Sequence, residues 1–190
     1  MPTHDSKRET KQEGRQDQRT EQRQDNQQEQ REHNKQIVHR FIEEAWNQGK
    51  TNVVSEMLAN NCRFHDEVFP HLTSGADNFR RHIESCRAGF PDLRFTIDDT
   101  IAERDEVVVH WTARGTHKGQ FLGMAPTNKK ASVTGTSIYR LEGGRINESW
   151  ANWNLMSMME QLGVGSAPQE QANKQTAGTK AQDAGTRTHA

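Results

Sequence analysis

A histidine and an aspartate that are adjacent in the chain are the first candidates for proton transfer. His65 and Asp66 follow one another, and an imidazole with a carboxylate nearby can act as a base near neutral pH. The surrounding residues predict a strand, in which adjacent side chains point to opposite faces, so only one of the two can face a pocket. We take His65 as the candidate catalytic group. The alternative is a polar residue that hydrogen-bonds backbone groups at the end of the strand.

A second histidine, His117, lies in a segment that contains two glycines. This segment, GTHKG at residues 115–119, ends a predicted strand and leads into a loop that closes near Pro126. Loops of this composition can move over a ligand, so His117 is a candidate catalytic or binding residue. The alternative is a histidine with a structural role in a turn.

Aromatic residues are numerous in the predicted strands and loops. They could form a flat hydrophobic wall for a polycyclic or terpenoid-like ligand, or belong to an ordinary core. These residues are Phe64, Trp111, Phe121, Tyr139, Trp150 and Trp153. Glu148 lies on the same predicted strand face as Trp150, where burial would raise its pKa; the alternative is a solvated glutamate at an edge. His110 alternates with Val109 and Trp111 and is expected to be exposed.

Hydrophobic residues define the part of the chain that can fold. The chain has 190 residues, of which 31% are hydrophobic, a low share for one compact domain. Residues 3–36 contain no hydrophobic side chain, and after Gly165 alanine is the only member of that class. Neither end can bury a core. We therefore predict a disordered Gln- and charge-rich arm at residues 1–35, a folded domain at 36–164 and a disordered tail at 165–190.

The predicted arm repeats an acidic and a basic residue every four positions. Asp25 and Glu29 are four residues apart, and Arg23 precedes Asp25 by two. Like charges at i,i+4 weaken a helix, and opposite charges two residues apart do not face one another. The repeat therefore favours disorder. Because Gln, Glu and Arg are good helix formers, a solvent-exposed helix is the alternative.

Charge and cysteine content exclude several classes of protein. The formal net charge is −1, with 25 basic and 26 acidic residues, and no segment is a polycation. This argues against nucleic acid or an anionic membrane as a partner. Cys62 and Cys86 lack the spacing of a metal site and are predicted to be buried thiols. No apolar run is long enough for a membrane span or a signal peptide, so the expected location is the cytoplasm.

Helical periodicity comes first along the domain, and strand periodicity follows it. Apolar spacing predicts helices over 37–46, over 51–58 with Thr51 as N-cap, and over 75–88 with Gly89 as C-cap. Strands are predicted over 62–67, 93–97, 107–113, 133–141 and 146–153, with a closing helix over 155–162. Helices followed by an antiparallel meander predict an α+β domain, in which one curved sheet wraps around the N-terminal helices. Such a cone can hold a small apolar ligand.

Several segments of the domain resemble the SnoaL-like polyketide cyclases, also called ester cyclases. They are VHRFIEEAWN (38–47), FPDLRF (90–95), WTARGTHKG (111–119), FLG (121–123) and QLG (161–163). The resemblance covers essentially all of 36–164. It implies the NTF2-like α+β cone, a homodimer, a pocket between sheet and helices, a His-Asp pair at His65 and Asp66, and His117 at the pocket mouth. It fixes no substrate, because this fold hosts enzymes and plain binding modules.

The resemblance also implies a catalytic carboxylate that is missing here. The family stretch has the form EHWDxWD, and this chain reads ESWANWN at residues 148–154. Ser149 replaces the usual His, Ala151 replaces an acid, and Asn154 stands where the base is expected. An amide cannot accept a proton at neutral pH, although Asn154 could still donate a hydrogen bond to a carbonyl or enolate oxygen.

Two functions follow as alternatives. The first is an ester cyclase, or a related lyase or isomerase, that binds a small hydrophobic carbonyl compound and assists proton transfer or aldol-type cyclisation without a metal or other cofactor. The second is a non-catalytic NTF2-like module for ligand binding or dimerisation, in which the pocket persists and the base does not. The catalytic candidates are His65, His117 and Asn154, and the pocket candidates are the aromatic residues named above with Glu148.

Overall fold

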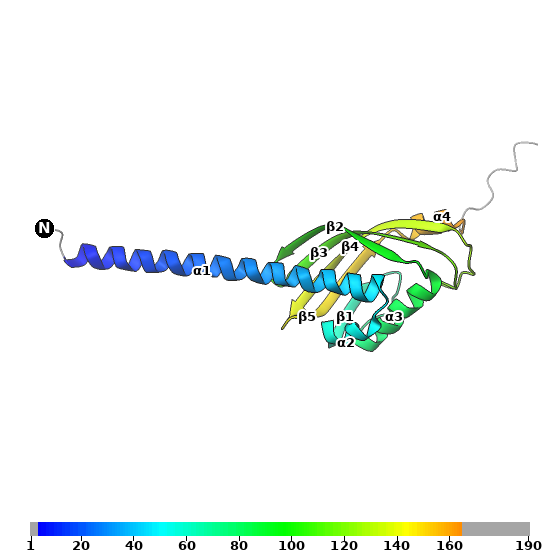
Figure 1. Cartoon of the computed structure of the whole chain (residues 1–190), viewed down its shortest axis with the longest axis horizontal. Coiled ribbons are helices and arrows are strands. Elements are labelled where there is room, and N and C mark those ends of the chain that lie inside the picture. Colours follow the sequence, from blue (N-terminus) through cyan, green and yellow to red (C-terminus); the bar gives the residue numbers. More distant parts are fainter. Residues whose placement is uncertain (1–3, 165–190) are drawn as a thin grey trace, which may run out of the picture.

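Helix α1 is the longest element of the computed structural model, which describes residues 4–164. It runs from His4 to Phe41, and Figure 1 shows its N-terminal part projecting away from the rest of the chain. The sequence favoured disorder over residues 1–35 and left a solvent-exposed helix as the alternative; the structure describes a helix from His4. Residues 18–30 are exposed. The predicted tail at 165–190 lies outside the described residues.

The buried end of α1 continues into a π-helical segment, η1 (Ile42–Asn47). The single helix predicted over 37–46 is therefore α-helical at first and wider at its end. Asn47 ties η1 to the sheet, because its side-chain oxygen accepts from the Phe95 N–H at 2.7 Å and its amide donates to the Phe95 carbonyl at 3.0 Å. Wide turns of this kind are frequent at functional sites. Here the turn carries Trp46, which lines the main cavity.

Short helical segments follow, and two predicted caps differ from the structure. The segments are η2 (Thr51–Val53), α2 (Val54–Met57) and α3 (Ala76–Gly89). The cap of η2 is Lys50, and Thr51 instead donates its hydroxyl to Glu84 of α3 at 3.2 Å. Gly89 is the last residue of α3 rather than a left-handed cap, and the cap is Phe90. A side chain larger than that of glycine would be crowded at position 89, because the Phe121 side chain packs directly against it.

The sheet has five strands in the order β1-β5-β4-β3-β2. Strands β2 (Arg94–Glu103), β3 (Glu106–Thr116), β4 (Lys130–Glu142) and β5 (Arg145–Trp153) form an antiparallel meander, as the alternating pattern predicted. Strand β1 (Leu58–Asp66) pairs with β5 in parallel, so this edge differs from the antiparallel pairing of the other strands. The reason is that β1 is separated from β5 by α3 and three strands, so no hairpin joins the two.

A bulge in the last hairpin decides which side chains of β5 face inward. Leu141 pairs with Ile146, but the preceding Arg140 pairs with Glu148, so Asn147 is an extra residue on β5. The extra residue shifts the alternation, because a bulge puts two residues opposite one. Ile146 and, beyond the bulge, Ser149 therefore share the inner face. Glu148 turns outward.

The core lies between the concave face of the sheet and the helices. Its wholly buried side chains include Val38 and Phe41 from α1, Ile83 from α3, and Val107 and Val109 from β3. These elements match the predicted amphipathic helices and alternating strands, which confirms the α+β cone. The glycines of the β4–β5 turn and Gly163 after α4 (Leu155–Leu162) have positive φ, as turn and C-cap positions require. None of the helices between residues 4 and 164 is long and apolar enough to cross a membrane.

Candidate active site

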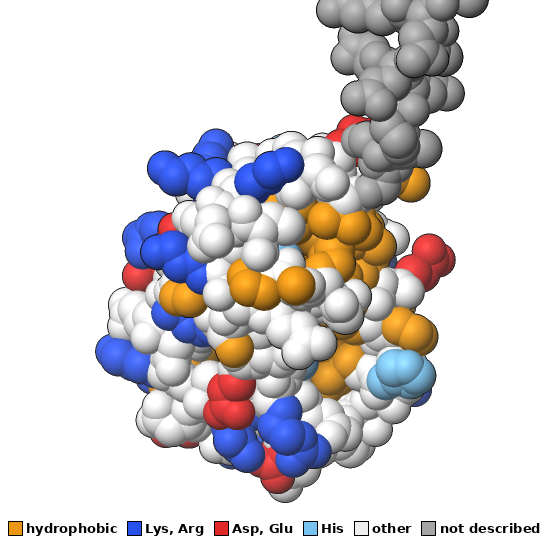
Figure 2. Space-filling view, turned by 90° about the vertical axis from the view of Figure 1, so that its right-hand side faces the viewer, with side chains coloured by type: hydrophobic (Ala, Val, Ile, Leu, Met, Phe, Trp, Pro, Cys, Tyr) orange, Lys and Arg blue, Asp and Glu red, His pale blue; other side chains and the backbone are white. Residues whose placement is uncertain are grey.

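A cavity of about 140 Å³ lies between the helices and the inner face of the sheet. Five of the six predicted aromatic residues line it; Trp150 does not, because the β5 bulge turns it outward. Aromatic residues that the sequence did not single out complete the wall: Trp46, Phe69, Phe79, Phe90 and Phe95. Figure 2 views the molecule from the end that carries α4 and shows hydrophobic side chains gathered in a hollow. The cavity can therefore bury an apolar, aromatic-sized ligand.

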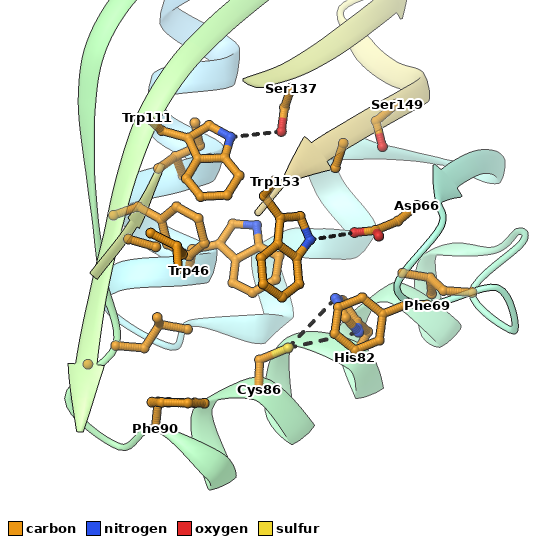
Figure 3. Close-up of a pocket in the computed structure, with 18 of the residues that line it drawn as sticks. Trp46, Asp66, Phe69, His82, Cys86, Phe90, Trp111, Ser137, Ser149 and Trp153 are labelled. Carbon is orange, nitrogen blue, oxygen red and sulfur yellow. Dashed lines mark hydrogen bonds between the residues drawn. The ribbon is translucent and has the colours of Figure 1, made fainter. Parts of the chain in front are cut away.

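Asp66, at the end of β1, is a carboxylate in this apolar wall. Its Oδ1 accepts from the Val68 backbone N–H at 2.8 Å, and its Oδ2 accepts from Trp153 Nε1 at 3.3 Å. Burial raises the pKa of Asp66 and outweighs these hydrogen bonds, which act to lower it. A carboxylate with a raised pKa is a stronger base than an exposed one. Figure 3 shows Asp66 pointing toward Trp153 across the cavity.

His82 of α3 is the second titratable group in the cavity. Burial lowers its pKa to about 4, so the imidazole is neutral at physiological pH. Its ring centroid lies 4.4 Å from that of Phe69 and 5.7 Å from that of Trp46. No pattern in the sequence singles out His82, because it lies on a helix with no catalytic neighbour in sequence. The signal available was its place three residues after Phe79 and four before Cys86, on the buried face of that helix.

Two other polar groups of the cavity, which are distant from Asp66 in the sequence, form a hydrogen bond with each other. Trp111 Nε1 donates to Ser137 Oγ at 3.0 Å. Burial raises the pKa of Tyr139 to about 12, so its hydroxyl keeps its proton. Cys62 and Cys86 are both free and buried, as predicted. Among the side chains that the structure describes, no three His, Cys, Asp or Glu residues form a group that could hold a metal ion.

The side chain of His65 turns to the other face of the sheet. Its Nε2 lies 2.9 Å from Glu148 Oε1, and its ring stacks on Trp150 with centroids 5.1 Å apart. His65 contributes to the rim of the cavity, but its imidazole binds a carboxylate outside. The expectation that His65 faces the pocket in place of Asp66 is therefore wrong. Side chains alternate along β1, and this alternation places Asp66, not His65, on the inner face of the sheet.

Glu148 is buried on this outer face, beneath a cluster of cations. Arg63 and Arg140 donate to its Oε2 at 2.9 and 2.8 Å. Burial alone would raise the pKa of Glu148, but the hydrogen bond from His65 and the charges of Arg63 and Arg140 hold it below its ordinary value. The predicted raised pKa is thus corrected. A glutamate tied to two arginines on the outer face has no route to a ligand in the cavity.

His117 is wholly buried and does not line the cavity. Its Nδ1 lies 3.2 Å from the Thr127 hydroxyl and accepts from the Thr127 backbone N–H at 3.4 Å, and its ring stacks on Phe90. These contacts join the two ends of the loop between β3 and β4. The expectation of a pocket-mouth position is therefore corrected, because His117 is buried and stabilises the loop through Thr127. Phe121 of the same loop lines the cavity.

Asn154 is exposed and caps helix α4. Its Oδ1 accepts from the Ser157 backbone N–H at 2.9 Å, and the residue does not line the cavity. A side-chain oxygen at this position satisfies an N–H that has no partner within the helix. Asn154 is thus placed to stabilise α4 rather than to polarise a ligand, and its expected position in the pocket is corrected.

The cap predicts a specific response to substitution. Asn154→Ala is expected to lower the free energy of unfolding by about 1 kcal/mol, since the Ser157 N–H loses its partner. Asn154→Asp is expected to leave it unchanged or slightly raised, because a carboxylate also caps and favours the positive end of the helix dipole. Urea denaturation of both variants measures this. Equal losses in the two variants would contradict the capping role.

The neutral state of His82 predicts how stability depends on pH. Its pKa is about 4 in the folded chain and ordinarily 6.5, so the unfolded chain binds the extra proton as pH falls from 6.5 toward 4. Stability is expected to fall over that window by up to about 3 kcal/mol. In His82→Leu this part of the loss should vanish, whereas His110→Gln, at an exposed site, should retain it. Urea midpoints measured from pH 4 to 7 decide between these outcomes.

The fold and the cavity define a class of protein: an α+β cone with a ligand pocket between sheet and helices. A family model described as SnoaL-like polyketide cyclase matches residues 36–162. The chain therefore belongs to the SnoaL-like polyketide cyclase family, of the NTF2-like fold. A comparison with curated proteins gives no match.

Solved structures of similar fold support this assignment. TsrD from Streptomyces laurentii is 26% identical, with a TM-score of 0.65, over 70% of this chain and 97% of that one. IdmH from Streptomyces antibioticus, named as a candidate polyketide cyclase, is 28% identical, with a TM-score of 0.60, over 69% and 99%. A candidate polyketide cyclase from Acidithiobacillus ferrooxidans is 26% identical, with a TM-score of 0.63, over 68% and 94%.

Proposed function

We propose that this chain is a cofactor-independent enzyme that binds a small hydrophobic carbonyl compound, such as a polyketide-like ligand, and removes a proton next to its carbonyl group. The observation that carries the proposal is Asp66. It is a carboxylate with a raised pKa at the wall of an aromatic cavity, held in place by Trp153. General-base catalysis needs such a group within reach of the ligand.

The proposed reaction is an intramolecular aldol-type closure or an isomerisation. The Asp66 carboxylate takes a proton from a carbon beside the carbonyl, and the C–H electron pair becomes the enolate. The enolate carbon then attacks a second carbonyl carbon of the same molecule, which forms a C–C bond and leaves an alkoxide. The alkoxide takes the proton that Asp66 removed, which restores the carboxylate for another cycle. The apolar wall assists because burial makes the carboxylate more basic.

The alternative function, a binding module without catalysis, was favoured by Asn154 at the expected position of the base. The capping bond from Asn154 to the start of α4 supplies a structural reason for the amide. Its presence therefore no longer argues against chemistry in the cavity. The catalytic roles first assigned to His65, His117 and Asn154 stay predictions, and the geometry favours Asp66 over all three. We also propose a homodimer, on the family resemblance alone, and a cytoplasmic location, as expected from the sequence.

A ligand screen followed by an exchange assay tests the proposed function. Polyketide, flavonoid and terpenoid carbonyl compounds are screened by thermal shift, and binders are incubated with the protein in D₂O. We expect stabilisation by at least one aromatic ketone and protein-dependent deuterium uptake at its α-carbon. Stabilisation without any uptake would favour the binding module. No stabilisation by any compound would contradict the proposed ligand class.

A further inference from the structure

His82 has two ring nitrogens without a strong hydrogen-bond partner. Among the described residues, the hydrogen-bonding partner found for both is the Cys86 sulfur, 3.7 Å from Nε2 and 3.9 Å from Nδ1. Sulfur is a weak donor and acceptor. Aromatic rings surround the imidazole on its other sides, and the residue lines the cavity. An imidazole buried among rings without a strong partner has hydrogen-bonding capacity left for a ligand.

His82 and Asp66 line the same cavity. The negative charge of Asp66 contributes, after burial, to raising the pKa of Cys86, and Cys86 contacts the His82 ring. The backbone also brings them together, because Val68, which holds Asp66, directly precedes Phe69, which packs on His82. Figure 3 shows His82 and Asp66 on the same side of Trp153. A ligand that reaches one can reach the other.

The chemistry of His82 is that of a neutral donor rather than a second base. Its lowered pKa means that the ring carries one proton at neutral pH and does not take up a second. A neutral imidazole beside a carboxylate base can donate N–H to a carbonyl oxygen and stabilise the enolate that forms. Of the other hydroxyls that line the cavity, Ser137 accepts from Trp111, and Ser149 lies on β5, the strand beside β1.

We propose that His82 donates a hydrogen bond to the carbonyl oxygen of the ligand whose α-proton Asp66 removes. This assigns the carbonyl end of the ligand to helix α3 and its acidic carbon to the end of β1. It rests on the proposed function for the choice of a carbonyl ligand. The hydrogen bond itself is a binding contact and can be measured without turnover.

The experiment uses two probes of the same shape. Acetophenone has a carbonyl oxygen where α-methylstyrene has a CH₂ group, and neither can donate a hydrogen bond to Asp66. Affinities of both probes are measured for the full chain, His82→Leu, His82→Asn and Ser137→Ala. The infrared carbonyl band of ¹³C-labelled acetophenone is recorded in each complex. Ser137→Ala is the matched control, because it removes another hydroxyl that lines the same cavity.

We expect His82→Leu to weaken acetophenone binding by about 5- to 10-fold relative to α-methylstyrene, the size of one net hydrogen bond. The carbonyl band should move to lower wavenumber in the wild type and in Ser137→Ala, return in His82→Leu, and move again in His82→Asn, whose amide restores a donor. An unchanged affinity ratio and band in His82→Leu would overturn the proposal, as would loss of the shift in Ser137→Ala.

The outcomes also separate this proposal from the proposed function. If acetophenone binds with a shifted band in His82→Leu, the His82 contact is wrong, and deuterium uptake can still show that Asp66 is a base. If uptake is absent while the band shift depends on His82, the contact is correct and the chain is a binding module. If neither probe binds the wild type, both proposals are contradicted.

Discussion

Asp66→Asn is expected to lower the rate of α-proton exchange by at least about 100-fold, the usual contribution of a positioned general base. The amide keeps the size of the side chain, and its one oxygen can still accept from the Val68 N–H, while its NH₂ group takes the place of the oxygen that accepts from Trp153. It has no carboxylate to take a proton. The measurement is deuterium uptake at the α-carbon of a bound aromatic ketone, followed by NMR. Binding of that ketone should stay within a few-fold of the wild type.

His65→Gln is the matched control for that variant. His65 is adjacent in sequence, but its ring binds Glu148 on the outer face of the sheet. Its exchange rate should therefore stay close to that of the wild type. A large loss in His65→Gln together with full activity in Asp66→Asn would return the base to His65 and contradict the assignment made from geometry.

Gly119→Ala is expected to have the largest effect on stability, a loss of about 2–3 kcal/mol in the free energy of unfolding. A methyl group there would overlap the backbone carbonyl of Ala88 at the end of α3. Backbone cannot move aside as a flexible side chain can. The Lys118 and Gly119 N–H groups both donate to the Gly89 carbonyl, so the substitution also pulls the loop off α3. Because the loop carries Phe121 into the cavity wall, ligand affinity should fall as well.

Lys118→Ala separates this effect from a general loop effect. Lys118 is exposed, and its backbone N–H remains after the substitution. Its free energy of unfolding should change by no more than about 0.5 kcal/mol. Urea denaturation of both variants supplies the comparison. A Gly119→Ala variant as stable as the wild type would show that this close approach of loop and helix is absent in solution.

Local patterns in the sequence predicted the elements of the fold well. Alternation located the meander, and apolar spacing located α3 and α4, because each element buries one face. The parallel edge β1 was missed, since pairing between distant segments leaves no local mark. The π-helical segment was missed because a wide turn at Trp46 shifts the helix by one residue without changing its composition. In the N-terminal arm, charge spacing favoured disorder and left a helix as the alternative, so it did not predict that helix α1 begins at His4.

The candidate site depends on features of the sheet that local sequence patterns do not predict. Choosing between His65 and Asp66 needed the phase of β1 relative to the cavity, which depends on its pairing with β5. Placing Glu148 and Trp150 needed the bulge at Asn147. Both are properties of the assembled sheet. Five of the six rings named from the sequence line the cavity, because side chains on the inner face of a small curved sheet point toward the helices that cover it.

Titration of the Asp66 carboxyl carbon by NMR tests the central claim most directly. We expect a pKa above the ordinary 3.8 for Asp66, because the cavity buries it, and a change in that pKa when acetophenone binds. Asp92 is an internal control, since its pKa is held below 3.8 by the hydroxyl and N–H of Thr116 and should not respond to the ligand. An Asp66 pKa at or below that of Asp92, unchanged by the ligand, would contradict the claim that this cavity is an acid–base site.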